Sequence, residues 1–194
     1  MTTVLRIGIA DDVDSVREML ARMIEDLGHE VLFTADSGRT LIEQCRQLKP
    51  DLVIADIRMP EMDGLDASQQ LNHERPTPVV LVSAYNDLDR IEAARDAHIL
   101  AYLIKPFRQE ELAAAIIVAR NRFEEFEILR MQAEHYRQAL EDRKLIERAK
   151  GILTTRSRLS EPDAFRQLQK LASSNNIKLV EAARNVISAD QTLG

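Results

Sequence analysis

The chain has 194 residues, of which 45% are hydrophobic, so it can bury a core without disulfides or a structural metal. Its length favours one domain of ordinary size followed by a smaller one. The single Cys45 excludes an internal disulfide and suggests a reducing compartment. Because the chain also shows no signal-peptide pattern and no apolar run long enough to span a bilayer, we expect a cytoplasmic protein without membrane contact.

The net charge of −6 hides an asymmetry between the two parts of the chain. Residues 1–119 carry 12 Lys and Arg against 21 Asp and Glu, whereas residues 120–194 carry 14 against 11. The acidic part excludes a nucleic-acid surface there. The basic part allows one, although a solvated helical face would have the same charge.

Residues 1–119 alternate between short apolar runs and helical spacing. The predicted strands are Val4–Ala10, Glu30–Ala35, Asp51–Ala55, Thr77–Val82 and Leu100–Ile104. The predicted helices are Ser15–Leu27, Arg39–Leu48, Gly64–Asn72, Asn86–Asp96 and one that begins near Gln109. Strands and helices that alternate with short connections form a parallel sheet with helices on both faces. We therefore predict an α/β fold for this part.

Polar residues follow four of the predicted strands: Asp11-Asp12, Asp56, Ser83 and Lys105. A lone carboxylate at the end of a strand more often caps the next helix. Asp56 is not alone, because parallel strands end at one edge of the sheet and bring these residues together. Three carboxylates repel one another unless a cation is present, and Mg²⁺ prefers such oxygens. With Lys105 beside it, an Asp nucleophile there can accept a phosphoryl group. We find no general base for substrate turnover and expect no enzyme.

These residues carry a resemblance that covers about residues 1–119. The chain resembles the receiver domain of bacterial two-component response regulators in the motifs Asp11-Asp12, Asp56 with Met59-Pro60 and Asp63-Gly64, Ser83-Ala84, Tyr102, and Lys105-Pro106-Phe107. The resemblance implies a flavodoxin-like five-stranded parallel sheet of order 2-1-3-4-5. Ser83 stands where Thr is commoner, and His98 stands at a turn position that usually has Gly.

The resemblance also implies roles for these residues. Asp56 would be the phosphoacceptor, and a sensor histidine kinase would supply the phosphoryl group. No small-molecule substrate is expected, and slow autodephosphorylation is the most that the site would catalyse. The implied Mg²⁺ ligands are Asp11, Asp12, Asp56 and the backbone carbonyl of Arg58. The implied phosphoryl-contact and switch residues are Ser83, Tyr102 and Lys105.

A long helix is predicted from Gln109 to about Thr155, because no helix-breaking residue precedes Gly151. Apolar residues recur within it at alternating steps of three and four, at Phe126, Leu129, Ala133, Tyr136 and Leu140. This spacing is typical of a coiled coil between two chains, or of a helix packed on its own chain. We assign residues 120–135 as a helical coiled-coil linker between a receiver at 1–119 and a second domain at 136–194.

Residues 136–194 form a predicted all-α unit of three helices. Ser160 caps a helix with Pro162 in its first turn, Asn175-Asn176 ends it, and a last helix follows from Leu179. The segment resembles the ANTAR domain of transcription antitermination regulators in the run 139–153, with its core Arg-Ala-Lys-Gly-Ile-Leu, and in 159–165 and 180–183. That family binds paired stem-loops in nascent leader transcripts. Thr154, where Met is usual, and the polar run 173–176 depart from its pattern.

Basic and small residues in this segment are candidates for RNA contact: Arg143, Lys144, Arg148, Ala149, Lys150 and Gly151. The cations can follow phosphates, and the small residues allow close approach. Ala149 and Gly151 fit tight packing inside the three-helix unit equally well.

The first hypothesis is a phosphorylation-controlled RNA-binding antiterminator that forms a homodimer on phosphorylation. The alternatives are a DNA-binding response regulator and a receiver that acts only through protein contacts.

Overall fold

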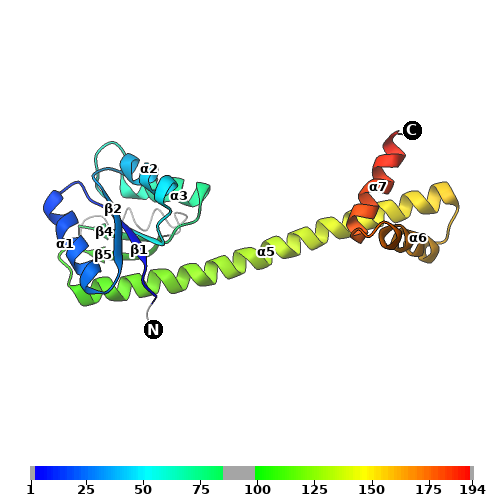
Figure 1. Cartoon of the computed structure of the whole chain (residues 1–194). Helices are drawn as coiled ribbons and strands as arrows, with labels where there is room; N and C mark the ends of the chain where they lie inside the picture. The colour runs from blue at the N-terminus through cyan, green and yellow to red at the C-terminus, as the bar shows by residue number, and fades with distance from the viewer. Residues whose placement is uncertain (1–2, 85–98, 193–194) are drawn as a thin grey trace. The chain divides into compact units, whose positions relative to one another are not determined.

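The computed structural model of the chain describes residues 3–84 and 99–192 (Figure 1). The predicted helix Asn86–Asp96 and His98 lie outside the described residues. Internal contacts divide the chain into two units, Met1–Glu127 and Ile128–Gly194. The predicted domain limits at 119 and 135 stay predictions. Among the described residues, no helix is long and apolar enough to cross a membrane.

The first unit contains a five-stranded parallel sheet in the order β2-β1-β3-β4-β5, as predicted. Its strands are β1 (Arg6–Ala10), β2 (Glu30–Ala35), β3 (Leu52–Asp56), β4 (Val79–Ser83) and β5 (Ile99–Ile104). The strand β4 begins two residues later than predicted, because Pro76 and Pro78 have no backbone N–H to donate to a neighbouring strand. Asp56 and Ser83 are the last residues of their strands and pair with Val82 and Ile104.

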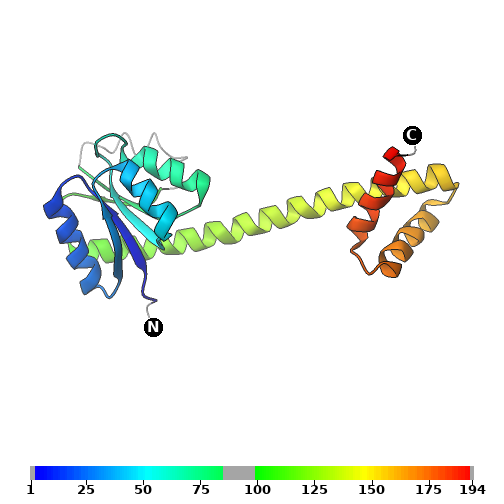
Figure 2. The same ribbon diagram turned by 45° about the horizontal axis from the view of Figure 1, so that its top comes forward.

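Helices cover both faces of this sheet, as Figures 1 and 2 show. On one face α1 (Asp14–Asp26) and the start of α5 (Gln109–Ser157) pack through Leu20, Ile24, Leu112 and Ile116. On the other face α2 (Gly38–Leu48) and α3 (Gly64–Glu74) bury Leu41, Ile42, Leu65 and Leu71. Cys45 of α2 belongs to the second core and is a packing residue. The central strands β3 and β4 are buried throughout, since helices lie on both sides.

Local chemistry explains where the helices begin and end. Gly28 has φ = 80° directly after α1, a conformation that glycine adopts without strain. The side chain of Ser37 accepts a hydrogen bond from the backbone N–H of Thr40 and caps α2. Asp63 caps α3 in the same way. The first residue of α3 is Gly64, and a larger residue does not fit there because its Cβ would collide with the backbone oxygen of Asp56. The motif Asp63-Gly64 therefore seats α3 against the end of β3.

The second unit consists of the end of α5, α6 (Glu161–Ser174) and α7 (Leu179–Thr192), as predicted. Ser160 caps α6 by accepting from the backbone N–H of Asp163, and Pro162 lies in the first turn. Asn176 follows α6 with φ = 53°. The core of this unit is small and aliphatic, formed by Ala149, Leu153, Ala164, Leu168, Ala172, Ala182, Ala183 and Ile187.

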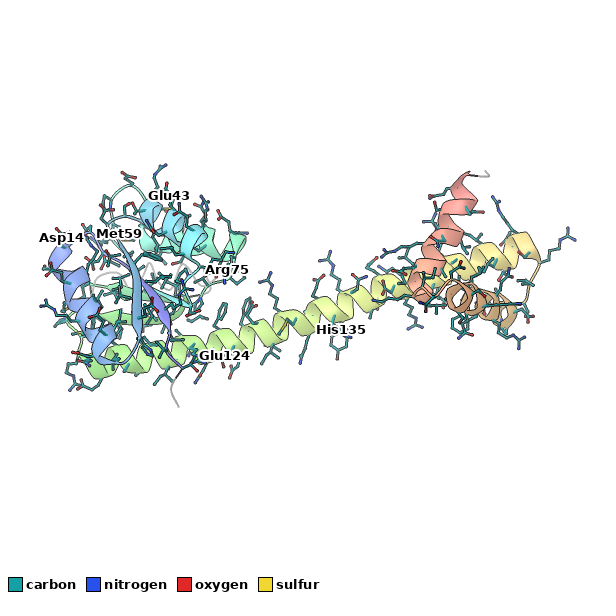
Figure 3. All side chains as sticks on the ribbon, viewed as in Figure 1. Asp14, Glu43, Met59, Arg75, Glu124 and His135 are labelled. Carbon is teal, nitrogen blue, oxygen red and sulfur yellow. The ribbon has the colours of Figure 1, made fainter. Side chains whose placement is uncertain are left out.

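The predicted heptad residues of α5 are largely exposed within this chain. Leu129, Tyr136 and Leu140 have 64%, 68% and 59% of their surface accessible. Figure 3 shows the side chains of this stretch, including His135, projecting from the helix. Packing on the described part of their own chain, one of the two explanations for the seam, is therefore excluded for these three residues. The seam between two chains stays a prediction.

Candidate functional site

Three of the predicted site residues meet at the carboxyl edge of the sheet. Asp11 follows β1, Asp56 ends β3 and Lys105 follows β5. The Lys105 Nζ atom donates to Asp11 Oδ2 at 2.8 Å and to Asp56 Oδ1 at 2.6 Å. In Figure 3, the labels Asp14 and Met59 mark the segments that follow β1 and β3, the strands whose carboxyl ends carry Asp11 and Asp56. The sheet thus joins residues that are 49 and 94 positions apart in sequence.

Backbone N–H groups hold both carboxylates in place. Asp11 Oδ1 accepts from the N–H of Val13 at 3.0 Å, and Asp56 Oδ2 accepts from the N–H of Arg58 at 2.7 Å. Together with Lys105, each of the four carboxylate oxygens has one hydrogen-bond donor. A carboxylate oxygen has two lone pairs, so each of the four oxygens can still accept a second contact.

The electrostatics of the site follow from burial and from the shared ammonium group. Burial raises the pKa of Asp56, with a smaller contribution from Asp11, and this outweighs the opposing effect of Lys105 and of the Arg58 N–H. Burial also disfavours the Lys105 ammonium, but its hydrogen bonds to Asp11 and Asp56 and their charges outweigh burial, so its pKa lies above the usual value. Lys105 is therefore a fixed positive charge between two carboxylates.

The predicted switch residues lie in contrasting surroundings. Ser83 is 1% exposed at the end of β4, and its hydroxyl oxygen has no hydrogen-bond partner. A buried hydroxyl without a partner costs free energy unless a ligand supplies one. Tyr102, on β5, is 49% exposed. Ser83 is thus the residue of the pair that a group bound at Asp56 would satisfy.

The donors are those that Mg²⁺ prefers, although only part of the predicted set is assembled. Asp11 and Asp56 are buried and face the same ammonium, whereas Asp12 is exposed. Within the described ranges, no group of three or more His, Cys, Asp or Glu side chains is arranged around a metal position. The Arg58 N–H donates to Asp56, and the predicted role of the Arg58 carbonyl as a ligand stays a prediction. Two carboxylates with spare lone pairs fit an oxygen-coordinated ion.

In the second unit, the structure separates the residues predicted to contact RNA. Arg143, Lys144 and Arg148 are exposed on α5, with Lys144 paired to Glu141. The Lys150 side chain is only 15% exposed, and Glu147 at 2.9 Å and Glu161 at 3.6 Å bind its Nζ atom. Its ammonium connects α5 to the start of α6.

The two small residues have opposite surroundings. Ala149 is fully buried in the three-helix core, so its predicted contact with RNA is wrong: the core covers its side chain. Gly151 is exposed, and a Cβ atom there would meet nothing within 4 Å, so tight packing does not explain it.

The fold brings to these sites two arginines that the sequence did not predict there. Arg17 donates to the backbone oxygen of Asp11 at 2.5 Å and also binds Asp14, so it supports the loop that carries the first carboxylate. Its spacing of three from Asp14, the residue directly before the predicted helix Ser15–Leu27, was the available signal. Arg156 lies next to Asp190 of α7, a pair that no local spacing reveals because 34 residues separate the two.

A parallel sheet of order 2-1-3-4-5 that gathers two aspartates and a lysine at its carboxyl edge defines the class of receiver domains. A sequence model of the response regulator receiver domain matches residues 7–117, and one of the ANTAR domain matches residues 134–187. The chain belongs to the family of response regulators that combine a receiver domain with an ANTAR domain.

Individual relatives agree with this assignment. The transcriptional regulatory protein PdtaR of Mycobacterium tuberculosis is 39% identical over 189 residues, which are 97% of this chain and 91% of the relative. The chemotaxis protein CheY of Thermotoga maritima is 35% identical over 57% of this chain and 93% of its own length. Among solved structures, a response regulator receiver domain protein from Clostridium thermocellum has a TM-score of 0.59 and 28% identity, covering 63% of this chain and 99% of that chain.

Proposed function

We propose that this response regulator accepts a phosphoryl group on Asp56 from a sensor histidine kinase, and that phosphorylation controls binding of leader-transcript stem-loops by the ANTAR domain. The observation that carries the proposal is the contact of Lys105 with both Asp11 and Asp56 at the carboxyl edge of the sheet. A structural ion pair alone would not require two carboxylates and a buried unpaired hydroxyl, from Ser83, at the same edge.

The chain's own residues account for the transfer step. An Asp56 carboxylate oxygen attacks phosphorus, a P–O bond forms, and the bond from phosphorus to the donor nitrogen or oxygen breaks with its electrons leaving on the donor. The Lys105 ammonium stabilises the charge on the phosphoryl oxygens, and the Ser83 hydroxyl donates to one of them. Mg²⁺, held by Asp11, Asp12, Asp56 and the Arg58 carbonyl, would add a second positive charge on these oxygens.

The output half of the proposal rests on exposed cations of the ANTAR domain. Arg143 and Arg148 project from α5 in a segment with 10 basic and 4 acidic residues between positions 143 and 184. Such a surface binds nucleic acid through phosphates. The RNA class comes from the family and not from the geometry, so duplex DNA of the same sequence is the necessary competitor in every binding measurement.

The test of the phosphoacceptor is labelling of the full chain with a small acyl phosphate in the presence of Mg²⁺. We expect the mass gain of one phosphoryl group in the wild type and none in Asp56→Asn, because the amide is not a nucleophile of comparable strength. Asp26→Asn, which changes an exposed carboxylate at the end of α1, is the matched control and should label normally. Labelling of Asp56→Asn at the wild-type level would refute the proposal.

Control of RNA binding is proposed to act through a homodimer joined along α5. The exposed Leu129, Tyr136 and Leu140 support this, since a second copy of the seam would cover them. Sedimentation of the wild type should show more dimer after labelling, and Leu129→Glu should abolish the increase. Met131→Glu is the control, because Met131 is equally exposed at 63% but lies off the seam. A labelled wild type that stays monomeric, even with RNA, contradicts this mechanism.

A further inference from the structure

The ANTAR unit has an open groove between the last turns of α5 and the end of α7. It has a volume of about 430 Å³ and is lined by Arg148, Gly151, Ile152, Thr155, Arg156 and Asp190. Figures 1 and 2 both show α7 lying against this part of α5. The lining residues of α5 recur at steps of three and four, so they occupy one face of the helix.

One residue that lines the groove, Gly151, has no side chain. Gly151 lies in the interior of α5, where glycine is a poor helix former, yet its backbone has no positive φ and a Cβ atom would meet nothing within 4 Å. The Thr155 hydroxyl donates to the Gly151 carbonyl oxygen at 2.9 Å, so it too stays close to the helix. In the described part of the chain, no atom would contact a Cβ at position 151, so the helix backbone is open here to the close approach of a partner.

The α5 side of the groove carries two guanidinium groups in different states. Arg148 is exposed, and no carboxylate in ranges 3–84 and 99–192 pairs with it. Arg156, two turns further along α5, is bound by Asp190, with 2.5 Å between Arg156 Nε and Asp190 Oδ1 and 3.3 Å between Arg156 Nη2 and the Asp190 carbonyl oxygen. A carboxylate held by the edge of a guanidinium group occupies the position that a phosphate would take.

We infer that this groove binds the phosphate backbone of an RNA stem-loop through Arg148 and Arg156, and that Asp190 competes with the RNA for Arg156. The inference rests on the proposed RNA-binding function and adds the site and its built-in competitor. It also reassigns the contact surface, because Lys150 is engaged by Glu147 and Glu161 while Arg148 is open. RNA binding requires Arg156 to exchange one anion, Asp190, for another.

The experiment measures binding of the phosphorylated full chain to a fluorescent RNA hairpin over a salt series. The hairpin is the tightest binder selected from a library with a randomised loop. We expect Arg148→Ala and Arg156→Ala each to lower affinity about tenfold and to reduce the salt slope by about 0.7 to 0.9, the value for one lost phosphate contact. Arg166→Ala is the control, because Arg166 is exposed on α6 and paired with Asp163, away from the groove.

The competitor is tested by Asp190→Asn, which should raise affinity several-fold, whereas Glu134→Gln, a charge-matched change at an exposed position of α5, should not. The gain must vanish in the Arg156→Ala background, since Asp190 acts through Arg156. A gain that persists there, or groove variants that bind like the wild type, would overturn the inference while leaving RNA binding established. Gly151→Gln should lower affinity without altering net charge, because its side chain fills the groove.

Other outcomes also decide the matter. Circular dichroism melting of each variant separates lost binding from lost folding, and a groove variant that melts like the wild type yet binds tenfold more weakly supports the site. Equal affinity for duplex DNA of the same sequence would overturn the choice of RNA. A wild type that binds no hairpin, labelled or unlabelled, would overturn the proposed function and this inference together.

Discussion

The two units use positive charge in different ways. In the receiver, Lys105 lies at the end of a strand between two buried carboxylates, and the rigid sheet fixes all three groups. In the ANTAR unit, cations lie on helix surfaces, and three of them pair with acids one turn away, as Lys144 does with Glu141. A motif spread over strand ends therefore assembles a defined site, whereas consecutive residues on a helix point in different directions and cannot all face one site.

The largest expected effect is on the receiver's charge balance. Replacing Lys105 by Met leaves Asp11 and Asp56 facing each other without a cation, and should lower the stability of the receiver by about 2 kcal/mol. This is less than for a fully buried pair because the lysine side chain is 32% exposed. Hydrogen exchange of β3 amides in the full chain measures it. Arg22→Met, an exposed cation of α1, should have little effect, and adding Asp11→Asn should recover part of the loss.

A second effect concerns the proposed ion. If Asp11 and Asp56 hold Mg²⁺, then Mg²⁺ at ten times its dissociation constant should stabilise the receiver by about 1.4 kcal/mol through mass action. The same exchange measurement detects it, and Asp11→Asn should abolish it. The ANTAR unit serves as an internal control, because its α6 and α7 amides should not respond. Equal protection of both units would contradict a site at the sheet edge.

Glycine provides a smaller contrast between the units. Gly151→Ala should stabilise the ANTAR unit by about 0.5–1 kcal/mol, because alanine is the better helix former and its Cβ meets nothing. Gly64→Ala should destabilise the receiver, since its Cβ would collide with the Asp56 backbone oxygen. Thermal melting, monitored by hydrogen exchange of the α3 amides and of the α5 amides around Gly151, compares the stability changes of the two units. A destabilising Gly151→Ala would show that the fold itself requires the glycine.

The smallest expected effect is at an exposed ion pair of the receiver. Hydrogen bonds from Arg46 and then Gln70 lower the pKa of Glu74 from 4.5 to about 2. A lowered pKa in the folded state contributes stability above pH 4.5 that is lost as the pH falls toward 2. Glu74→Gln should therefore flatten the fall in stability over this window, only slightly because the pair is exposed. Acid titration with Glu43→Gln as the control checks it.

Periodicity predicted much of the fold because each pattern has a local cause. The structure confirms the predicted strand Glu30–Ala35, the predicted start of α5 at Gln109 and the predicted Ser160 cap. Alternation, helix length and capping are properties of short segments, so the sequence alone predicts them. The early start predicted for β4 was wrong, because an apolar run containing Pro78 does not pair at its first residues. The convergence of Asp11, Asp56 and Lys105 was predictable from the rule that parallel strands end at one edge.

The sequence by itself determined the class of fold, the three charged residues at the sheet edge and the division into an acidic and a basic part. Only the tertiary structure decided which members of the basic segment face outward. Ala149 and Lys150 are neighbours of Arg148 and Gly151 in sequence, yet one is in the core and the other is bound by Glu147 and Glu161. Likewise Asp190 meets Arg156 only because α7 folds back on α5. Helical spacing places residues on a face, but the packing of the other helices decides which face is covered.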